Sequence, residues 1–193
     1  QAMGHYVHDL SSGLQDFIVG AAHKFHGPKG SGFLYIHHRN KINPLIIGGS
    51  QERNMRGGTE NVAGIVGLAK ALEIAYATMD DDRKHIEALK AQMIKSLREK
   101  IPEVTFNGES ASLEKSLYTL LNVSLPESED NDMLLFSLDI KKISASGGSA
   151  CASGTNIGSH VLEAIGANTK RGAVRFSFSK FTTNEDIDYA VDV

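Results

Sequence analysis

The chain has 193 residues, of which 41% are apolar, and a formal net charge of −3. The small negative charge excludes the basic surface typical of nucleic-acid-binding domains, and no apolar run approaches the roughly 20 residues of a membrane-spanning helix. The single cysteine cannot form an internal disulfide, which fits a reducing compartment, and we expect a cytoplasmic protein.

Two short apolar strands, predicted over residues 16–20 and 32–36 and expected to be buried, flank a polar loop that contains three glycines and one proline. Lys24 follows the first strand directly, in a position where an unpaired lysine is unusual. One interpretation is a Schiff-base lysine with a nucleophilic amine; the other is an ordinary solvated loop. The glycine spacing does not match an ATP-binding loop, and a metal site at His23 and His26 lacks a nearby carboxylate or cysteine. The loop alone leaves the first two interpretations open.

A second glycine-rich loop, over residues 48–58, precedes two helices. Thr59 or Asn61 is expected to cap the first helix. The second helix begins at the three aspartates 80–82, since negative charge is favourable at a helix N-terminus, and it ends before Pro102.

The charged break between these helices indicates a domain boundary near residues 77–82. We therefore expect a first domain over residues 1–79 and a second over 80–193, the second a mixed α+β unit whose apolar residues 133–138 lie in its core. In it the sequence predicts strands over 104–106, 118–124 and 173–179, short helices over 131–138, 159–165 and from 184 onward, and a strand or strand end over 143–146.

Arg175 and Cys151 are the candidate reactive residues of the second domain. Strand alternation places Arg175 on the face opposite Val174 and Phe176, and arginine is suited to bidentate binding of a carboxylate, although an exposed arginine on a strand is the commoner explanation. Cys151 lies in a run of small residues, 144–154, with no large apolar neighbours. This context favours an accessible nucleophile over a flexible linker that happens to contain a cysteine.

Taken together, these motifs resemble the class V pyridoxal-phosphate-dependent cysteine desulfurases. The resemblance extends along nearly the whole chain, and its motifs occur in the family's order. They are His23-Lys24-x-x-Gly27-Pro28-Lys29-Gly30, Gly48-Gly49-x-Gln51-Glu52-Arg53-x-x-Arg56-x-Gly58-Thr59, Gly148-Ser149-Ala150-Cys151, Val174-Arg175-Phe176-Ser177 and Phe181-Thr182-Thr183.

The resemblance implies a role for each candidate residue. Lys24 would hold pyridoxal 5'-phosphate (PLP) covalently, and His23 would contact its phosphate. Gln1 would donate a hydrogen bond to a ring oxygen of the cofactor. Thr59 would reach the phosphate bound to a second copy, which makes the expected protein a homodimer. No metal is expected.

The implied reaction removes sulfur from L-cysteine and yields L-alanine. Arg175 would bind the substrate carboxylate, and Cys151 would carry the persulfide to an acceptor, such as an iron–sulfur scaffold protein. The implied fold is the carboxy-terminal portion of a fold-type I PLP-dependent transferase, an α/β protein. Residues 1–79 would end its large domain, and 80–193 would form its small one.

Two departures from the family pattern bear on this interpretation. Relatives commonly have a phosphate-binding serine where this chain has Ala21, and several cofactor contacts of the family precede the first residue, so the isolated chain is expected to be inactive. The alternatives are a selenocysteine lyase or another class V PLP transaminase, and, from a different class, a non-catalytic sulfur-relay or scaffold fragment.

Overall fold

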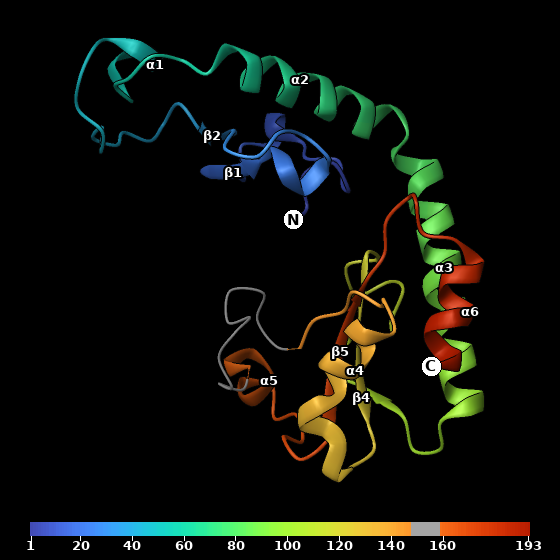
Figure 1. Cartoon of the computed structure of the whole chain (residues 1–193). Coiled ribbons are helices and arrows are strands. Elements are labelled where there is room, and N and C mark those ends of the chain that lie inside the picture. Colours follow the sequence, from blue (N-terminus) through green and yellow to red (C-terminus); the bar gives the residue numbers. More distant parts are fainter. Residues whose placement is uncertain (148–158) are drawn as a thin grey trace. The chain divides into compact units, whose positions relative to one another are not determined.

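The computed structural model describes residues 1–147 and 159–193, and the chain forms two compact units, Gln1–Met79 and Asp80–Val193 (Figure 1). The division falls at the residue where the sequence places the domain boundary. Whether these units are parts of a large and a small domain stays a prediction. No single helix among the described residues is long and apolar enough to cross a membrane; α2 (Val62–Ala77) and α3 (Met79–Lys100) reach that threshold only when counted together across the break between them.

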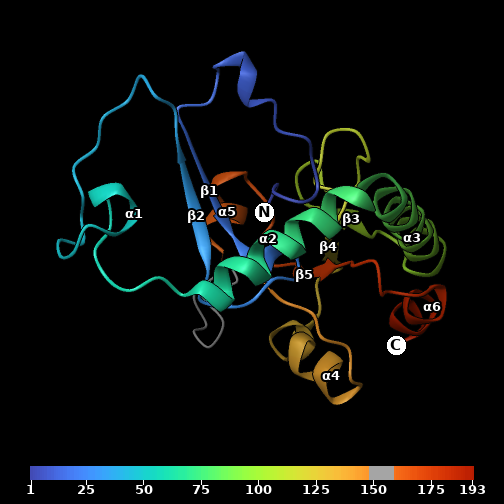
Figure 2. The same cartoon turned by 90° about the horizontal axis from the view of Figure 1, so that it is seen from above.

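The first unit is built on an antiparallel hairpin of β1 (Phe17–Ala21) and β2 (Gly32–Ile36), which lie side by side in Figure 2. The predicted bounds of both strands are confirmed to within one residue. At the open end of the hairpin Arg39 donates to the Asp16 carboxylate at 2.7 Å, and this hydrogen bond lowers the pKa of Asp16. At the other end β1 continues without a break into the 3-10 helix η2 (Ala22–Phe25).

The core of the first unit lies around η2. Ala22 and Phe25 are buried together with Met3, and partly buried apolar side chains of the hairpin and of α2 (Val62–Ala77) pack against them. Gly4 has a left-handed backbone, and a Cβ atom there would come within 2.9 Å of the Phe25 Cβ. The N-terminal segment and α2 therefore both hold η2 in place. The partly buried residues are Ile18, Phe33, Leu68, Ala71, Leu72 and Ala75.

The opposite face of the hairpin is also apolar, but residues of the first unit do not cover it. Phe17 is 48% exposed, Val19 77% and Leu34 49%, so the prediction of a fully buried strand over residues 16–20 is wrong for this chain. Strands that are apolar on both faces are typical of sheets covered on both sides. The helix α2 repeats the pattern, with Val62, Ile65 and Val66 exposed.

The loop between β2 and α2 contains a short turn, α1 (Gln51–Asn54), with left-handed backbone at three consecutive non-glycine residues. Each such residue costs about 1–2 kcal/mol relative to a right-handed conformation. Gly57 N–H donates to the Ile46 carbonyl at 2.8 Å and closes the loop. The sequence predicts a loop here but not the left-handed backbone conformation of these three residues. At the end of the loop Asn61, rather than Thr59, caps α2 by accepting from Gly64 N–H.

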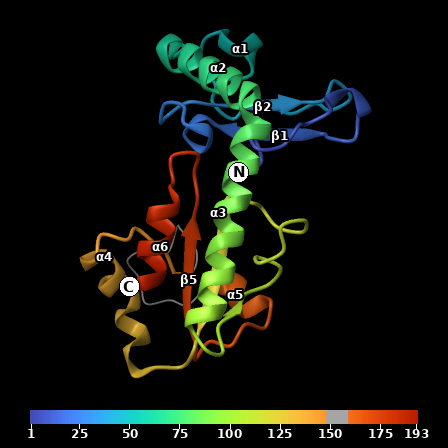
Figure 3. The same cartoon turned by 90° about the vertical axis from the view of Figure 1, so that its right-hand side faces the viewer.

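The second unit is a three-stranded antiparallel sheet in the order β3 (Thr105–Phe106), β4 (Leu120–Leu125) and β5 (Gly172–Ser177). The helices α3 (Met79–Lys100) and α6 (Asn184–Asp192) lie side by side along it (Figure 3). They run in the same direction, as shown by hydrogen bonds or ion pairs that join His85 to Thr182, Gln92 to Asp188 and Lys100 to Asp192.

The buried residues of the second unit come from α3, α6 and one face of the sheet. The predicted capping box of α6 is confirmed, with Thr183 and Asp186 each bonding the other's backbone. These buried apolar residues are Ile86, Leu89, Met93, Ile94, Leu97, Tyr118, Leu121, Val123, Leu138, Val174, Phe178, Ile187 and Val191.

Two expectations for the second unit need correction. Of the apolar run 133–138, only Leu138 is buried, while Met133 and Phe136 are more than half exposed. Met133 ends a 3-10 helix, η3 (Glu129–Met133), and the rest of the run lies in α4 (Leu134–Ile140), of which only Leu138 is buried. Residues 143–146 form no strand, only a single bridge from Ser146 to β5. The predicted helix over 159–165 is present as α5 (His160–Ala164).

Lys90 on α3 is fully buried, which the sequence analysis did not anticipate. Its Nζ donates to Ser116 Oγ at 2.7 Å and to the Leu117 carbonyl at 3.2 Å. These two hydrogen bonds hold the segment before β4 against α3. Burial lowers the pKa of Lys90 from 10.5 to about 8, because a buried ammonium loses its hydration.

This pKa shift predicts a pH-dependent stability. Between pH 8 and 10.5 the unfolded chain binds the Lys90 proton and the folded chain does not, so the free energy of unfolding rises with pH across that window. The rise is at most roughly 3 kcal/mol, and Lys90→Met should abolish it. Denaturant unfolding of the full-length protein, followed by a probe on α3, measures this free energy at each pH.

The exposed Lys95 on the same helix supplies the control, because Lys95→Met should show the same pH dependence of stability as the wild type. Identical pH profiles for the wild type and Lys90→Met would contradict the prediction.

Candidate functional site

The His23 and Lys24 side chains lie on η2, at the carboxyl end of β1, and both are exposed. The following loop folds back on the helix, since Gly27 N–H donates to the Ala22 carbonyl at 2.8 Å and Ala22 N–H donates to the Ser31 carbonyl at 3.0 Å. Neither His23 nor Lys24 has a side-chain hydrogen bond or ion pair among the described residues. These backbone hydrogen bonds hold the loop against η2, and the amine of Lys24 and the imidazole of His23 are accessible to a ligand.

Gln1 and Thr59, the other two predicted cofactor contacts, are also exposed in the first unit. Gln1 lies three residues before Gly4, whose backbone packs against Phe25, so the structure brings the segment carrying Gln1 against the helix that carries Lys24. Thr59 lies just before the cap of α2, and its side chain makes no hydrogen bond to η2 within the part of the chain that the structure describes.

These residues fit PLP in chemical type. Lys24 offers the primary amine that a covalent aldehyde linkage requires, and His23 and Thr59 offer donors for a phosphate. The backbone of Gly27 lies so close to η2 that a Cβ atom there would be 2.8 Å from the Ala22 Cβ. Ala21, by contrast, has no side-chain donor. The residues present therefore supply the amine that PLP requires and some, but not all, of the donors for its phosphate.

Arg175 lies in β5 of the second unit and is partly buried. Its Nε atom is inaccessible to solvent and has no hydrogen-bond partner. A buried guanidinium nitrogen without a partner is costly, which makes this side chain suited to an anionic ligand. Its backbone forms two hydrogen bonds with Ser146, at 2.6 and 3.1 Å.

Cys151 lies outside the described residues. The residues that flank its segment are described, and both are held within the second unit. Gly147 packs against Leu135 and the Ala173 carbonyl, so closely that a Cβ atom would lie 2.8 Å from the Leu135 side chain. Ser159 caps α5 by accepting from Leu162 N–H at 3.4 Å. The structure thus describes the contacts of the two residues that flank this segment, Gly147 and Ser159.

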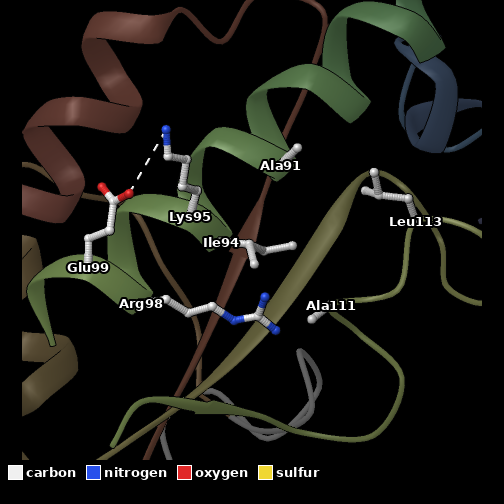
Figure 4. A pocket seen from close by; sticks show the side chains of 7 residues that line it. All are labelled: Ala91, Ile94, Lys95, Arg98, Glu99, Ala111 and Leu113. Atoms are coloured by element: carbon white, nitrogen blue, oxygen red, sulfur yellow. Dashed lines mark ion pairs between the residues drawn. The ribbon is translucent and has the colours of Figure 1, made fainter. Parts of the chain in front are cut away.

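A shallow groove of about 360 Å³ in the second unit contains none of the predicted site residues. Figure 4 shows Arg98 extending from α3 across the groove toward Ala111, and an ion pair from Lys95 to Glu99 at 3.9 Å. The guanidinium of Arg98 lies over the Phe106 ring at 5.4 Å. The groove is therefore separate from the candidate chemistry.

Sequence reasoning missed Asn122 on β4. It lies opposite Arg175 in the β4–β5 pairing and accepts a hydrogen bond from Asn107 Nδ2 at 2.8 Å. The available signal was its place between two apolar residues of a strand, where alternation puts its side chain on the same face as a cross-strand arginine.

Comparison with known proteins gives consistent matches along the whole chain. Residues 1–190 match the family model described as aminotransferase class V. The chain is 40% identical to a cysteine desulfurase IscS of Dictyoglomus turgidum and 43% identical to one of Clostridium botulinum, over 100% of this chain and 48% and 49% of those proteins. A solved structure described as a NifS-like protein superposes with a TM-score of 0.84 at 36% identity, covering 100% of this chain and 48% of that one. The chain spans about half the length of these relatives.

Proposed function

The chain belongs to the aminotransferase class V family, and on that basis we propose that it is a carboxy-terminal portion of a PLP-dependent cysteine desulfurase. The observation that carries the proposal is the match to proteins named cysteine desulfurase IscS over the whole chain, at 40–43% identity. The selenocysteine lyase, transaminase and scaffold alternatives gain no support from these relatives.

Lys24 and His23 would hold the cofactor. Their exposed side chains lie on η2 and make no hydrogen bond or ion pair with any described residue, so neither must break such a bond to hold the cofactor. When bound, PLP supplies an electron sink for charge that develops on the substrate's Cα. Lys24 would then remove and return the Cα proton as a general base and acid. Gln1 would donate to a ring oxygen.

Arg175 would bind the carboxylate of L-cysteine through its guanidinium, and the Cα–H and the thiol of the substrate would stay free to react. Cys151, as the thiolate, would attack the substrate sulfur. The new S–S bond forms as the substrate's Cβ–S bond breaks, and the electron pair left on Cβ takes up one proton. With the proton that Lys24 returns to Cα, this gives L-alanine. The products are L-alanine and a persulfide on Cys151.

The expected partners follow from the same residues. The Thr59 side chain makes no hydrogen bond to η2 in the described part of its own chain, and we propose that it serves the cofactor site of a second copy in a homodimer. The persulfide would pass to an acceptor protein, such as an iron–sulfur scaffold. We propose a cytoplasmic location, in keeping with a free thiol as carrier.

Borohydride reduction of the full-length protein, followed by peptide mapping, tests the cofactor assignment. Reduction fixes a Schiff base as a stable amine, so a pyridoxyl group is expected on the peptide that contains Lys24 and not on the one that contains Lys41. An unmodified Lys24 in protein supplied with PLP would support the scaffold alternative instead.

A further inference from the structure

Asn122 and Arg175 occupy the same face of the sheet in the second unit. They are direct cross-strand partners, and such pairs have Cβ atoms about 4.5–5.5 Å apart on one face. The other face carries Leu121, Val123 and Val174, all fully buried. Asn122 and Arg175 therefore lie on the face away from that core.

Asn107 and Ser110 hold Asn122 in place, the first through its side chain and both through its backbone. Asn107 Nδ2 donates to its Oδ1 at 2.8 Å. Its backbone N–H donates to Ser110 Oγ at 3.2 Å, and its carbonyl accepts from Ser110 Oγ and from Asn107 N–H, each at 3.0 Å. The carbonyl end of the side chain is thus occupied, while its Nδ2 has no acceptor among the described residues.

Two neighbouring side chains on this face consequently offer donors without acceptors. Arg175 Nε is buried and unpartnered, and Asn122 Nδ2 is oriented by the bond to Asn107. A carboxylate accepts up to about four hydrogen bonds and matches such a pair, with the guanidinium fork on one side and the amide on the other.

We propose that Asn122 is a second substrate-binding residue, which donates from Nδ2 to the α-carboxylate that Arg175 binds. The inference rests on the proposed function, because it concerns the same carboxylate. It adds a specificity determinant: a ligand must carry an anion at this position to satisfy both donors. Asn107 acts as a positioning residue that fixes the amide, and Ser110 holds the backbone of Asn122.

Equilibrium binding of the reaction product separates this role from a structural one. L-Alanine carries the carboxylate, and L-alaninamide replaces it with a neutral amide. Calorimetric titration of the full-length protein with each ligand gives two dissociation constants per variant. Asn122→Leu removes one hydrogen bond to a charged group and should weaken L-alanine binding about 10-fold. L-Alaninamide binding should change by less than about 2-fold, since that ligand never made the charged contact.

Asn122→Asp is the sharper variant. The new carboxylate lies opposite Arg175, pairs with the guanidinium and occupies it, so L-alanine binding should weaken by at least roughly 30-fold. The control Asn168→Asp adds the same charge at an exposed site of the second unit and should bind L-alanine as the wild type does.

Unchanged L-alanine binding in both Asn122 variants would overturn the proposal, and so would equal weakening for L-alanine and L-alaninamide, which indicates a structural role. If Asn122→Asp does not fold, Asn122→Leu decides alone. Failure of the proposed function is seen separately, as wild-type protein that binds L-alanine but does not form it from L-cysteine.

Discussion

Replacing Lys24 with alanine is expected to lower the rate of L-alanine formation from L-cysteine by at least roughly 1,000-fold in the full-length protein. Two contributions are lost together: the covalent attachment of the cofactor and the group that moves the Cα proton, and acid–base catalysis alone is worth about 10²–10⁴-fold. Alanine formation and the cofactor's absorbance after dialysis are the measurements.

The structure indicates that this variant should fold. Lys24 is exposed, and its side chain makes no hydrogen bond or ion pair in the described part of the chain, while the neighbouring Ala22 and Phe25 supply the packing of η2. Lys41→Ala, at another exposed lysine of the same unit, is the control and should keep wild-type activity and absorbance. A Lys24→Ala protein that retained either one would remove Lys24 from the site.

Replacing Cys151 with serine is expected to abolish the persulfide and to lower alanine formation by at least roughly 100-fold. A serine hydroxyl is not ionised near neutral pH and is a much weaker nucleophile toward sulfur than a thiolate. Persulfide is measured by alkylation and mass spectrometry, and alanine by chromatography.

The Cys151→Ser variant should differ from Lys24→Ala in one respect: it should keep the cofactor, because Lys24 and not Cys151 is assigned to PLP. Borohydride labelling of Lys24 in this variant is the control. Full sulfur release without Cys151 would favour a selenocysteine lyase or another class V transaminase.

Local sequence patterns predicted most of the elements of this fold. The hairpin of β1 and β2, the acidic start of α3 and the capping box of α6 each depend on neighbouring residues: alternation, charge at a helix end and reciprocal side-chain bonds. The resemblance supplied the family, which the family-model match over residues 1–190 confirms. Such features need no knowledge of distant partners.

Features that depend on distant partners were not predictable in this way. Apolar character predicted burial for Val19 and Phe136, which are 77% and 57% exposed, because hydrophobicity does not state what covers a side chain. The buried Lys90 was missed because its partners lie 26 and 27 residues away. Asn122 was missed for a similar reason, since its significance appears only once β4 and β5 pair.

The most direct test supplies isotopically labelled L-cysteine to the full-length protein and maps the label by mass spectrometry. The account predicts one added sulfur atom on the peptide containing Cys151 in the wild type, and none in Lys24→Ala. A wild-type protein that forms L-alanine while this peptide stays unlabelled would contradict it, as would equal labelling in Lys24→Ala.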